Sequence, residues 1–446
     1  MAFEFVDNNA PIDRAVRRRI RSHVAIGKNA GRTLVRPSRT KAAARETGTR
    51  SMTALVKIPR VVAGARNTEE EEQDSFSFVS RPYDAADLHT SVDTSSSPTS
   101  MWVQFMFLDE AFFHCAIAAS VTARNGLVTE KDDPNEVLRH LSQSFRLINE
   151  RLSGNNPVSD ETIAVVVILA QHERIRGHYG EGLVHISGLE RMVQLRGGVR
   201  ALSKYRPGLT QKLFKVDLAY ALHQGTATRF SAEDLLPSST ALFGRFSGTE
   251  IYYDQELSDL IDPELSKHLS TNLQTVFMDM NSLARLMNDA SAGNCPKIKS
   301  YVFLDTINLL GYRLLQVSTL SRPNSFSYLE NAVHVGLAIY IIAFQRGLDM
   351  KVSEVPLISN LARSLLRDHV SSEQVDREVI LWILFIGQTS TFGEVDDIWV
   401  IPKMRETVRS LGIGSWEGVS KMLAKFPCVI DVHGKSAQAL WYKSNF

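Results

Sequence analysis

The sequence has few of the groups that metal proteins and disulfide-linked proteins need. Its 446 residues include three cysteines, Cys115, Cys295 and Cys428, which lie far apart. Three separated thiols cannot form a closed disulfide framework or complete a four-thiolate zinc site, and they fall short of the set that a binuclear zinc cluster needs. We therefore expect a reducing compartment and no zinc cluster within these residues.

Long apolar runs are also missing. The longest, residues 164–170 and 337–344, are well short of the roughly 18–20 residues that a membrane-spanning helix needs. The first residues, MAFEFVDNNAP, have two early acids and no apolar stretch after a basic start, so we expect no secretory signal. The last three residues match no targeting address. The sequence predicts no membrane partner.

Motifs for nucleotide binding and hydrolysis are missing as well. There is no GxxxxGK[ST] loop and no GxSxG elbow. The segment GIGSWEG at 412–418 misses the GxGxxG spacing, and we interpret it as a turn in which Ser415 caps the next helix. Cys115 follows His114, but neighbours on a helix point about 100° apart, which favours a buried structural cysteine. We predict no catalytic residue and no enzyme.

Histidines and carboxylates supply at most half of a metal site. His172-Glu173 lacks the second histidine of an HExxH motif. His178 and His185 are seven residues apart and could share a helix face with Glu181 between them. No third ligand is evident, so we predict no metal and no cofactor.

Positive charge is concentrated in the first 66 residues. They hold 15 of the 50 Lys and Arg residues but 4 of the 49 Asp and Glu residues, so they carry +11 against −10 for the rest of the chain. At 11–23, apolar residues recur every four positions between arginines, which is typical of a short basic amphipathic helix. The remainder, up to residue 66, shows little periodicity. We predict a largely flexible basic arm over 1–66.

Such an arm usually meets nucleic acid, an import receptor or an acidic surface. Phosphate contacts of this kind give affinity without sequence specificity. We call the candidate residues for import or phosphate contact the arm arginines: Arg14, Arg17, Arg18, Arg19 and Arg21. An acidic and serine-rich linker over 67–100 follows, which we interpret as a solvated spacer rather than a cover for the arm.

From residue 101 the periodicity is helical almost throughout, so the sequence predicts an all-α domain over 101–446 with about a dozen helices. A helix over 134–153 is the best punctuated, with Asp133 as cap, Pro134 at the first position and Glu136 completing a capping box. Apolar residues at 269–287 alternate in fours and threes as in a coiled-coil seam. We favour a core helix over a dimer zipper there, and a homo-oligomer stays an open alternative.

Two segments carry a more specific pattern. Residues 182–202 read GLVHISGLERMVQLRGGVRAL, and 377–441 contain REVILWILFIGQTSTFGEVDDIW followed by SWEGVSKMLAKFPCV. In this order, and with the IRSHV block at 20–24, they resemble the fungal-specific transcription factor domain family. Its helical regulatory regions usually accompany zinc binuclear-cluster DNA-binding domains. The matching positions are His185, Gly188, Leu189, Gly197, Gly198, Trp382, Gly387, Trp416, Glu417, Phe426 and Pro427.

The resemblance implies a transcriptional regulator in the nucleus, of the kind that lacks the zinc cluster. It would act through its helical domain on other regulators, with the arm supplying import-receptor contact and weak, non-specific DNA contact. The alternative is an effector-binding or scaffolding helical module with no direct DNA role. One departure from the family pattern is Cys428, which stands where a tryptophan is frequent.

The matching positions also have roles that physics predicts. Gly197 and Gly198 can end a helix in a left-handed backbone. Gly188 costs about 1 kcal/mol against alanine in a helix, so we expect it to permit a close helix–helix approach. Trp382 and Trp416 are expected to be core anchors. All these roles are structural.

Overall fold

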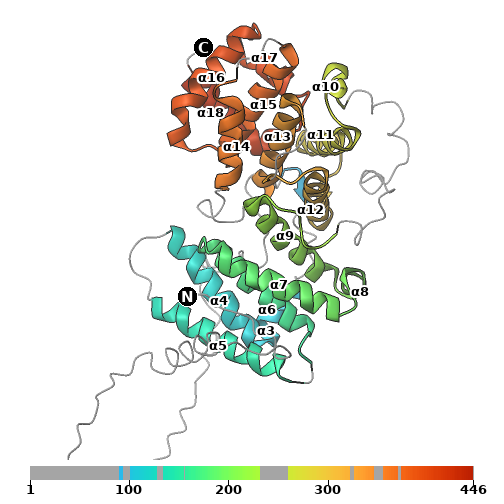
Figure 1. Ribbon diagram of the computed structural model, residues 1–446, viewed down its shortest axis with the longest axis vertical. Coiled ribbons are helices and arrows are strands. Elements are labelled where there is room, and N and C mark those ends of the chain that lie inside the picture. The colour runs from blue at the N-terminus through green and yellow to red at the C-terminus, as the bar shows by residue number, and fades with distance from the viewer. Residues whose placement is uncertain are drawn as a thin grey trace, which may run out of the picture. The chain divides into compact units, whose positions relative to one another are not determined.

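The computed structural model describes residues 90–93, 101–127, 134–154, 156–231, 260–321, 326–345, 355–369 and 373–444 (Figure 1). All of them belong to one unit, which includes Phe76–Phe446. The predicted arm over 1–66, with its five arm arginines, lies outside the described residues, as does most of the predicted linker. The arm, the linker and their boundaries therefore stay predictions.

Helices dominate the described residues, which confirms the all-α prediction. Within these residues two short strands, β1 (Val92–Asp93) and β2 (Ile298–Lys299), pair in parallel with Val92 opposite Ile298. Just before β1, the Thr90 hydroxyl donates to the Asp431 carboxylate. These bonds attach the first described segment to the C-terminal half of the chain.

The first seven described helices pack mainly through α4, α6 and α9. α4 lies against α5 and α6, and α6 lies against α7 and α9. α6 is buried along most of its length because its sequence AVVVILA offers no polar face. We call these helices the N-terminal group: α3 (Met101–Leu108), α4 (Glu110–Leu127), α5 (Pro134–Leu152), α6 (Asp160–Ile175), α7 (Tyr179–Leu195), α8 (Val199–Tyr205) and α9 (Pro207–Gln224).

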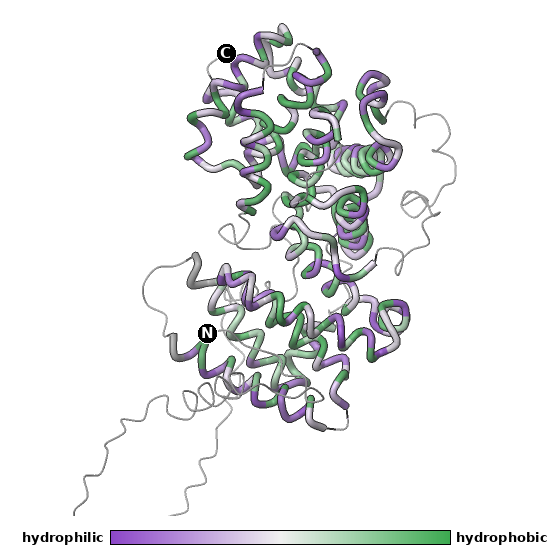
Figure 2. The backbone as a smooth tube through the Cα atoms, viewed as in Figure 1, coloured by the Kyte–Doolittle hydropathy of each residue, from purple (hydrophilic) through white to green (hydrophobic). Residues whose placement is uncertain are grey.

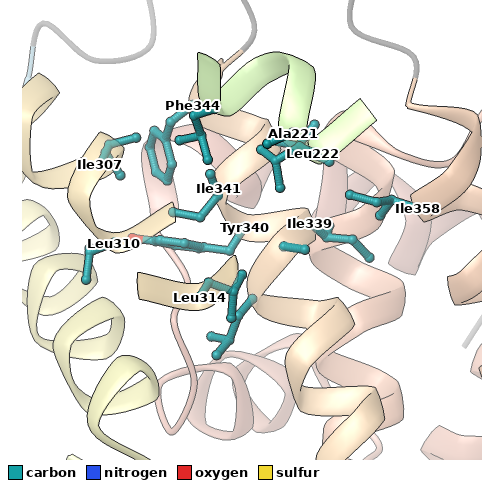
Figure 3. Packing of buried hydrophobic residues seen from close by; sticks show 14 of the residues in the cluster. Ala221, Leu222, Ile307, Leu310, Leu314, Ile339, Tyr340, Ile341, Phe344 and Ile358 are labelled. Atoms are coloured by element: carbon teal, nitrogen blue, oxygen red, sulfur yellow. The ribbon is translucent and has the colours of Figure 1, made fainter. Parts of the chain in front are cut away.

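The later helices pack around α13 and α15, and α9 connects them to the N-terminal group through α12, α13 and α14. Figure 3 shows this junction, where Leu222 of α9, Ile307 of α12 and Ile341 of α13 share one core. We call them the C-terminal group: α10 (Pro263–Lys267), α11 (Thr271–Ser291), α12 (Ser300–Val317), α13 (Tyr328–Gln345), α14 (Pro356–Leu366), α15 (Gln374–Ser390), η4 (Glu394–Asp396), α16 (Asp397–Ser410), α17 (Trp416–Leu423), η5 (Ile430–Gly434) and α18 (Lys435–Lys443).

Several local predictions can be compared with these elements. The helix predicted over 134–153 is α5, while its expected cap, Asp133, lies outside the described residues. Ser415 caps α17 as predicted, because its hydroxyl accepts the Gly418 N–H at 3.2 Å. Figure 2 shows apolar and polar stretches alternating along the helices.

The apolar seam at 269–287 belongs to the core. Its six residues are all buried, and from residue 271 on they lie in α11. A seam buried inside one chain has no apolar face left for a second copy, so the prediction of a core helix is confirmed. The seam residues are Leu269, Leu273, Val276, Met280, Leu283 and Met287.

Among the described residues, no single helix is long and apolar enough to cross a membrane. Met101–Leu108 and Glu110–Ala123 reach the required length and apolarity only when taken together, and they are bent by 112° at Asp109.

Candidate functional site

A buried carboxylate lies where α6 turns into α7. Glu173 is 2% exposed, and its Oε1 lies 3.3 Å from His172 Nδ1. Gly177, with a φ of +71°, reverses the chain, and the His178 N–H then donates to the Glu173 carbonyl at 2.8 Å. The reversal brings His178 Nδ1 to 3.3 Å from Glu173 Oε2. Arg176, three residues after Glu173 and before the turn, places its Nη1 3.4 Å from the same oxygen. We call Glu173, His172, Arg176, His178 and His185 the histidine–glutamate cluster.

The electrostatics of this cluster keep Glu173 charged. Burial alone would raise the pKa of Glu173, but its hydrogen bond to His172 and the nearby charges of His172 and Arg176 outweigh burial and lower it. His185 is fully buried, and burial lowers its pKa to about 4, so its imidazole is neutral at pH 7. Thr122 Oγ1 lies 3.1 Å from His172 Nε2 and connects the cluster to α4.

A glycine that sequence analysis missed makes room for a side chain of α9 against α7. A β-carbon on Gly182 would lie 1.6 Å from the Tyr220 hydroxyl oxygen. That hydroxyl donates to the Ala170 carbonyl of α6 at 2.8 Å, so Tyr220 cannot easily move away. We expected the close approach at Gly188, which is half-buried; that expectation stays a prediction.

The Gly-Gly turn ends α7. Gly197 and Gly198 both have a φ of +89°, in the left-handed region that favours glycine, and the Gly198 N–H donates to the Val193 carbonyl at 2.9 Å. The preceding Arg196 donates from Nη2 to Asp160 Oδ1 at 2.7 Å. The turn therefore attaches the end of α7 to the start of α6. One turn back in α7 from Val193, Leu189 is fully buried.

Asp160 is held by a second arginine as well. Arg206 donates from Nε to Asp160 Oδ2 at 2.5 Å. Burial alone would raise the pKa of Asp160, but its hydrogen bonds to both arginines lower it. The aspartate stays charged at the first turn of α6, where the helix dipole also favours an anion.

In the C-terminal group, Trp382 meets two motif residues that follow it by 44 and 45 positions in the sequence, Phe426 and Pro427. Trp382 of α15 is fully buried and stacks on Phe426 with ring centroids 5.2 Å apart. Its Nε1–H donates to the Pro427 carbonyl at 3.0 Å. Phe277 of α11 lies edge-on to both rings. We call these four residues the tryptophan stack.

The remaining motif positions lie near this stack along the chain. A β-carbon on Gly387 would lie 2.3 Å from the Phe392 ring, so this glycine lets the chain fold back after α15. Trp416 is half-buried and contacts the rings of Phe385 and Trp441. It is therefore less enclosed than Trp382.

The two histidines weighed as metal ligands differ in their exposure to solvent. His178 pairs with Glu173, and it is 39% exposed, whereas His185 is fully buried. Within the described ranges, no group of three or more His, Cys, Asp and Glu side chains is placed to hold a metal ion. Cys115 is buried, and burial raises its pKa, which disfavours the nucleophilic thiolate.

One open depression of about 610 Å³ lies along α16, lined by Pro402, Arg405, Glu406, Arg409 and Ser410. Its lining comes from one helix and is largely charged, unlike the enclosed apolar pocket that an effector-binding module would need.

These features define an all-helical domain whose motif residues join helices to one another. The model of the fungal-specific transcription factor domain matches residues 83–411, more than half of the chain, and the protein belongs to this family. The match begins inside the predicted linker and ends before Trp416, Phe426 and Pro427. No curated protein and no solved structure matches the chain.

Proposed function

We propose that this protein is a nuclear transcriptional regulator that acts through its helical domain, without a zinc-cluster DNA-binding module in these 446 residues. Membership of the fungal-specific transcription factor domain family carries the proposal, because that family is a regulatory domain of transcription factors and is not a class of enzymes.

The basic arm supports the nuclear part of the proposal. Its charge of +11 precedes a remainder of −10, and the arm arginines fall within one short amphipathic pattern. Such a segment suits an import receptor or a phosphate backbone. The sequence holds three cysteines where a binuclear zinc cluster uses six, so DNA contact would come from the arm or from a partner regulator.

Localisation of the tagged full chain tests this proposal. We expect the unmodified protein in the nucleus and a variant with all five arm arginines changed to glutamine in the cytoplasm. A matched control makes the same charge change later in the arm, at Arg32, Arg36, Arg39, Arg45 and Arg50, and should stay nuclear. A cytoplasmic unmodified chain would refute the nuclear role, and loss of import in the control alone would refute the role of the arm arginines.

Regulation itself needs a second readout. The full chain fused to an unrelated DNA-binding domain should change transcription of a reporter that carries the matching site. A reporter that does not respond in either direction would favour the alternative, an effector-binding or scaffolding module.

Direct DNA contact is tested by fluorescence anisotropy with random-sequence duplex DNA over a salt series. If the arm binds phosphates, log K should fall with log salt by about 0.9 per contact, and the arm-arginine variant should show a smaller slope. Absence of binding at low salt would leave import or partner contact as the role of the arm.

A further inference from the structure

The helices α4 and α5 carry the same short pattern. In each, a glutamate precedes a histidine by one turn: Glu110 and His114 in α4, Glu136 and His140 in α5. The two helices are antiparallel. The Ser144 hydroxyl donates to the Ala111 carbonyl at 3.0 Å, and further along α4 His114 meets His140, which lies earlier in α5. This arrangement sets the two imidazoles opposite each other.

The two rings face each other through the same ring atom. His114 Nδ1 and His140 Nδ1 are joined by a hydrogen bond at 2.8 Å, in which one imidazole donates its N–H to the other. Zinc is bound by histidine nitrogens at about 2.0–2.1 Å, which places two such nitrogens about 3.3 Å apart in a tetrahedral site. Opening the pair by about half an ångström would admit the ion, which would replace the shared proton and release it to solvent.

The carboxylates lie behind the rings, where they can support them. Glu110 Oε1 is 3.8 Å from His114 Nε2, the nitrogen that points away from His140. The Gln143 amide donates to the same carboxylate oxygen at 3.2 Å and holds it. Metal-bound histidines typically donate their second N–H to a carboxylate, which orients the ring and strengthens it as a ligand.

The pair is accessible from solvent. The His114 side chain is 21% exposed, so an ion and its waters can reach the pair from solvent.

We propose that His114 and His140 form a Zn²⁺ site that bridges α4 and α5. The two Nδ1 atoms are the protein ligands, water completes the coordination, and Glu110 is a positioning residue for His114. Imidazole nitrogen suits zinc. With two protein ligands the site binds an exchangeable ion and stabilises the first pair of long helices.

Calorimetric titration of the full chain with ZnCl₂ tests the site. We expect binding that saturates at one equivalent. His114→Gln and His140→Gln should each weaken it by on the order of tenfold or more, and Glu110→Gln by about tenfold, the lower end of the usual cost of losing an outer carboxylate. The matched control is His268→Gln, whose imidazole is 40% exposed and lies 4.0 Å from a Glu373 oxygen, with no second histidine paired to it.

Thermal melts provide a second readout. Zinc should raise the melting temperature of the unmodified chain and of His268→Gln, but not that of His140→Gln. Absence of saturable binding would overturn the proposal. So would histidine variants that bind zinc as tightly as the unmodified chain, or a control variant that loses as much affinity as they do. If a histidine variant fails to fold, Glu110→Gln decides instead, because its side chain is 61% exposed and its loss should leave the fold intact.

Discussion

The two groups of helices are held together by different forces at the places described above. In the N-terminal group, charged partners surround Glu173 at the end of α6 and Asp160 at its start. In the C-terminal group, Trp382 and Phe426 are held by close packing of rings. A charged cluster responds to pH and to the loss of one partner, whereas a packed stack responds to changes in volume. Each region should therefore fail under a different kind of substitution.

The largest expected effect is in the stack. Trp382→Ala should lower the free energy of unfolding by about 3–5 kcal/mol, because the ring is fully buried and its removal leaves a cavity. Trp416→Ala, at a half-buried tryptophan, is the control and should cost clearly less. Chemical denaturation measures both. Equal losses of unfolding free energy in the two variants would mean that the packing of Phe426 and Phe277 around Trp382 adds nothing to stability.

The N-terminal group also has one position, Gly182, where the space available for a side chain decides stability. A substitution there tests whether this group responds to volume as well as to charge. Gly182→Ala should cost up to about 3 kcal/mol, since the new methyl group would overlap the Tyr220 ring. Gly180→Ala in the same helix has nothing within 4 Å and should be neutral or slightly stabilising. If both substitutions are neutral, α7 and α9 do not approach as closely as described.

Glu173→Gln should cost about 2 kcal/mol at pH 7, because it removes the charge that His172, His178 and Arg176 contact. The folded-state pKa of Glu173 is lowered below its usual 4.5, so its contribution is present above that pH and is lost as the pH falls further. Denaturation curves at several pH values should therefore show the two proteins converging in acid. A constant difference down to acidic pH would show that shape rather than charge is what Glu173 supplies.

Acid should also lower the free energy of unfolding through a buried histidine in each of the two groups. His185 and His433 are buried with pKa values of about 4, so each binds a proton more readily once unfolded, and stability falls as the pH drops from about 6.5 towards 4. The effect of Glu173 is thus read as the difference between variant and unmodified chain at each pH.

The fold class could be predicted from the sequence because helical periodicity is a local signal. The 134–153 helix, the Ser415 cap and the buried seam of α11 all follow from spacing within one element. Whether these three features form depends little on how the rest of the chain folds.

The histidine–glutamate cluster could not be predicted in the same way. His172-Glu173 does not complete an HExxH motif, and the chain reversal at Gly177 is what brings His178 back to Glu173. The close approach at Gly182 depends on Tyr220, which lies 38 positions later in another helix. Contacts between elements are decided by packing, which spacing along one helix does not report.

The smallest expected effect separates the two groups most cleanly, because the same cap occurs in each. Ser159 begins α6 and Ser415 begins α17, and each hydroxyl accepts a backbone N–H from three residues later at 3.2 Å. Replacing either with alanine should cost about 1 kcal/mol.

Because α9 packs on α12, α13 and α14 as well as on α6, the two groups share a core and should unfold together. Ser159→Ala and Ser415→Ala should then each shift a single calorimetric transition by a similar amount. Two transitions, with Ser159→Ala moving one and Ser415→Ala the other, would show instead that the junction at α9 does not couple them, so the charged and the packed regions stabilise separate units.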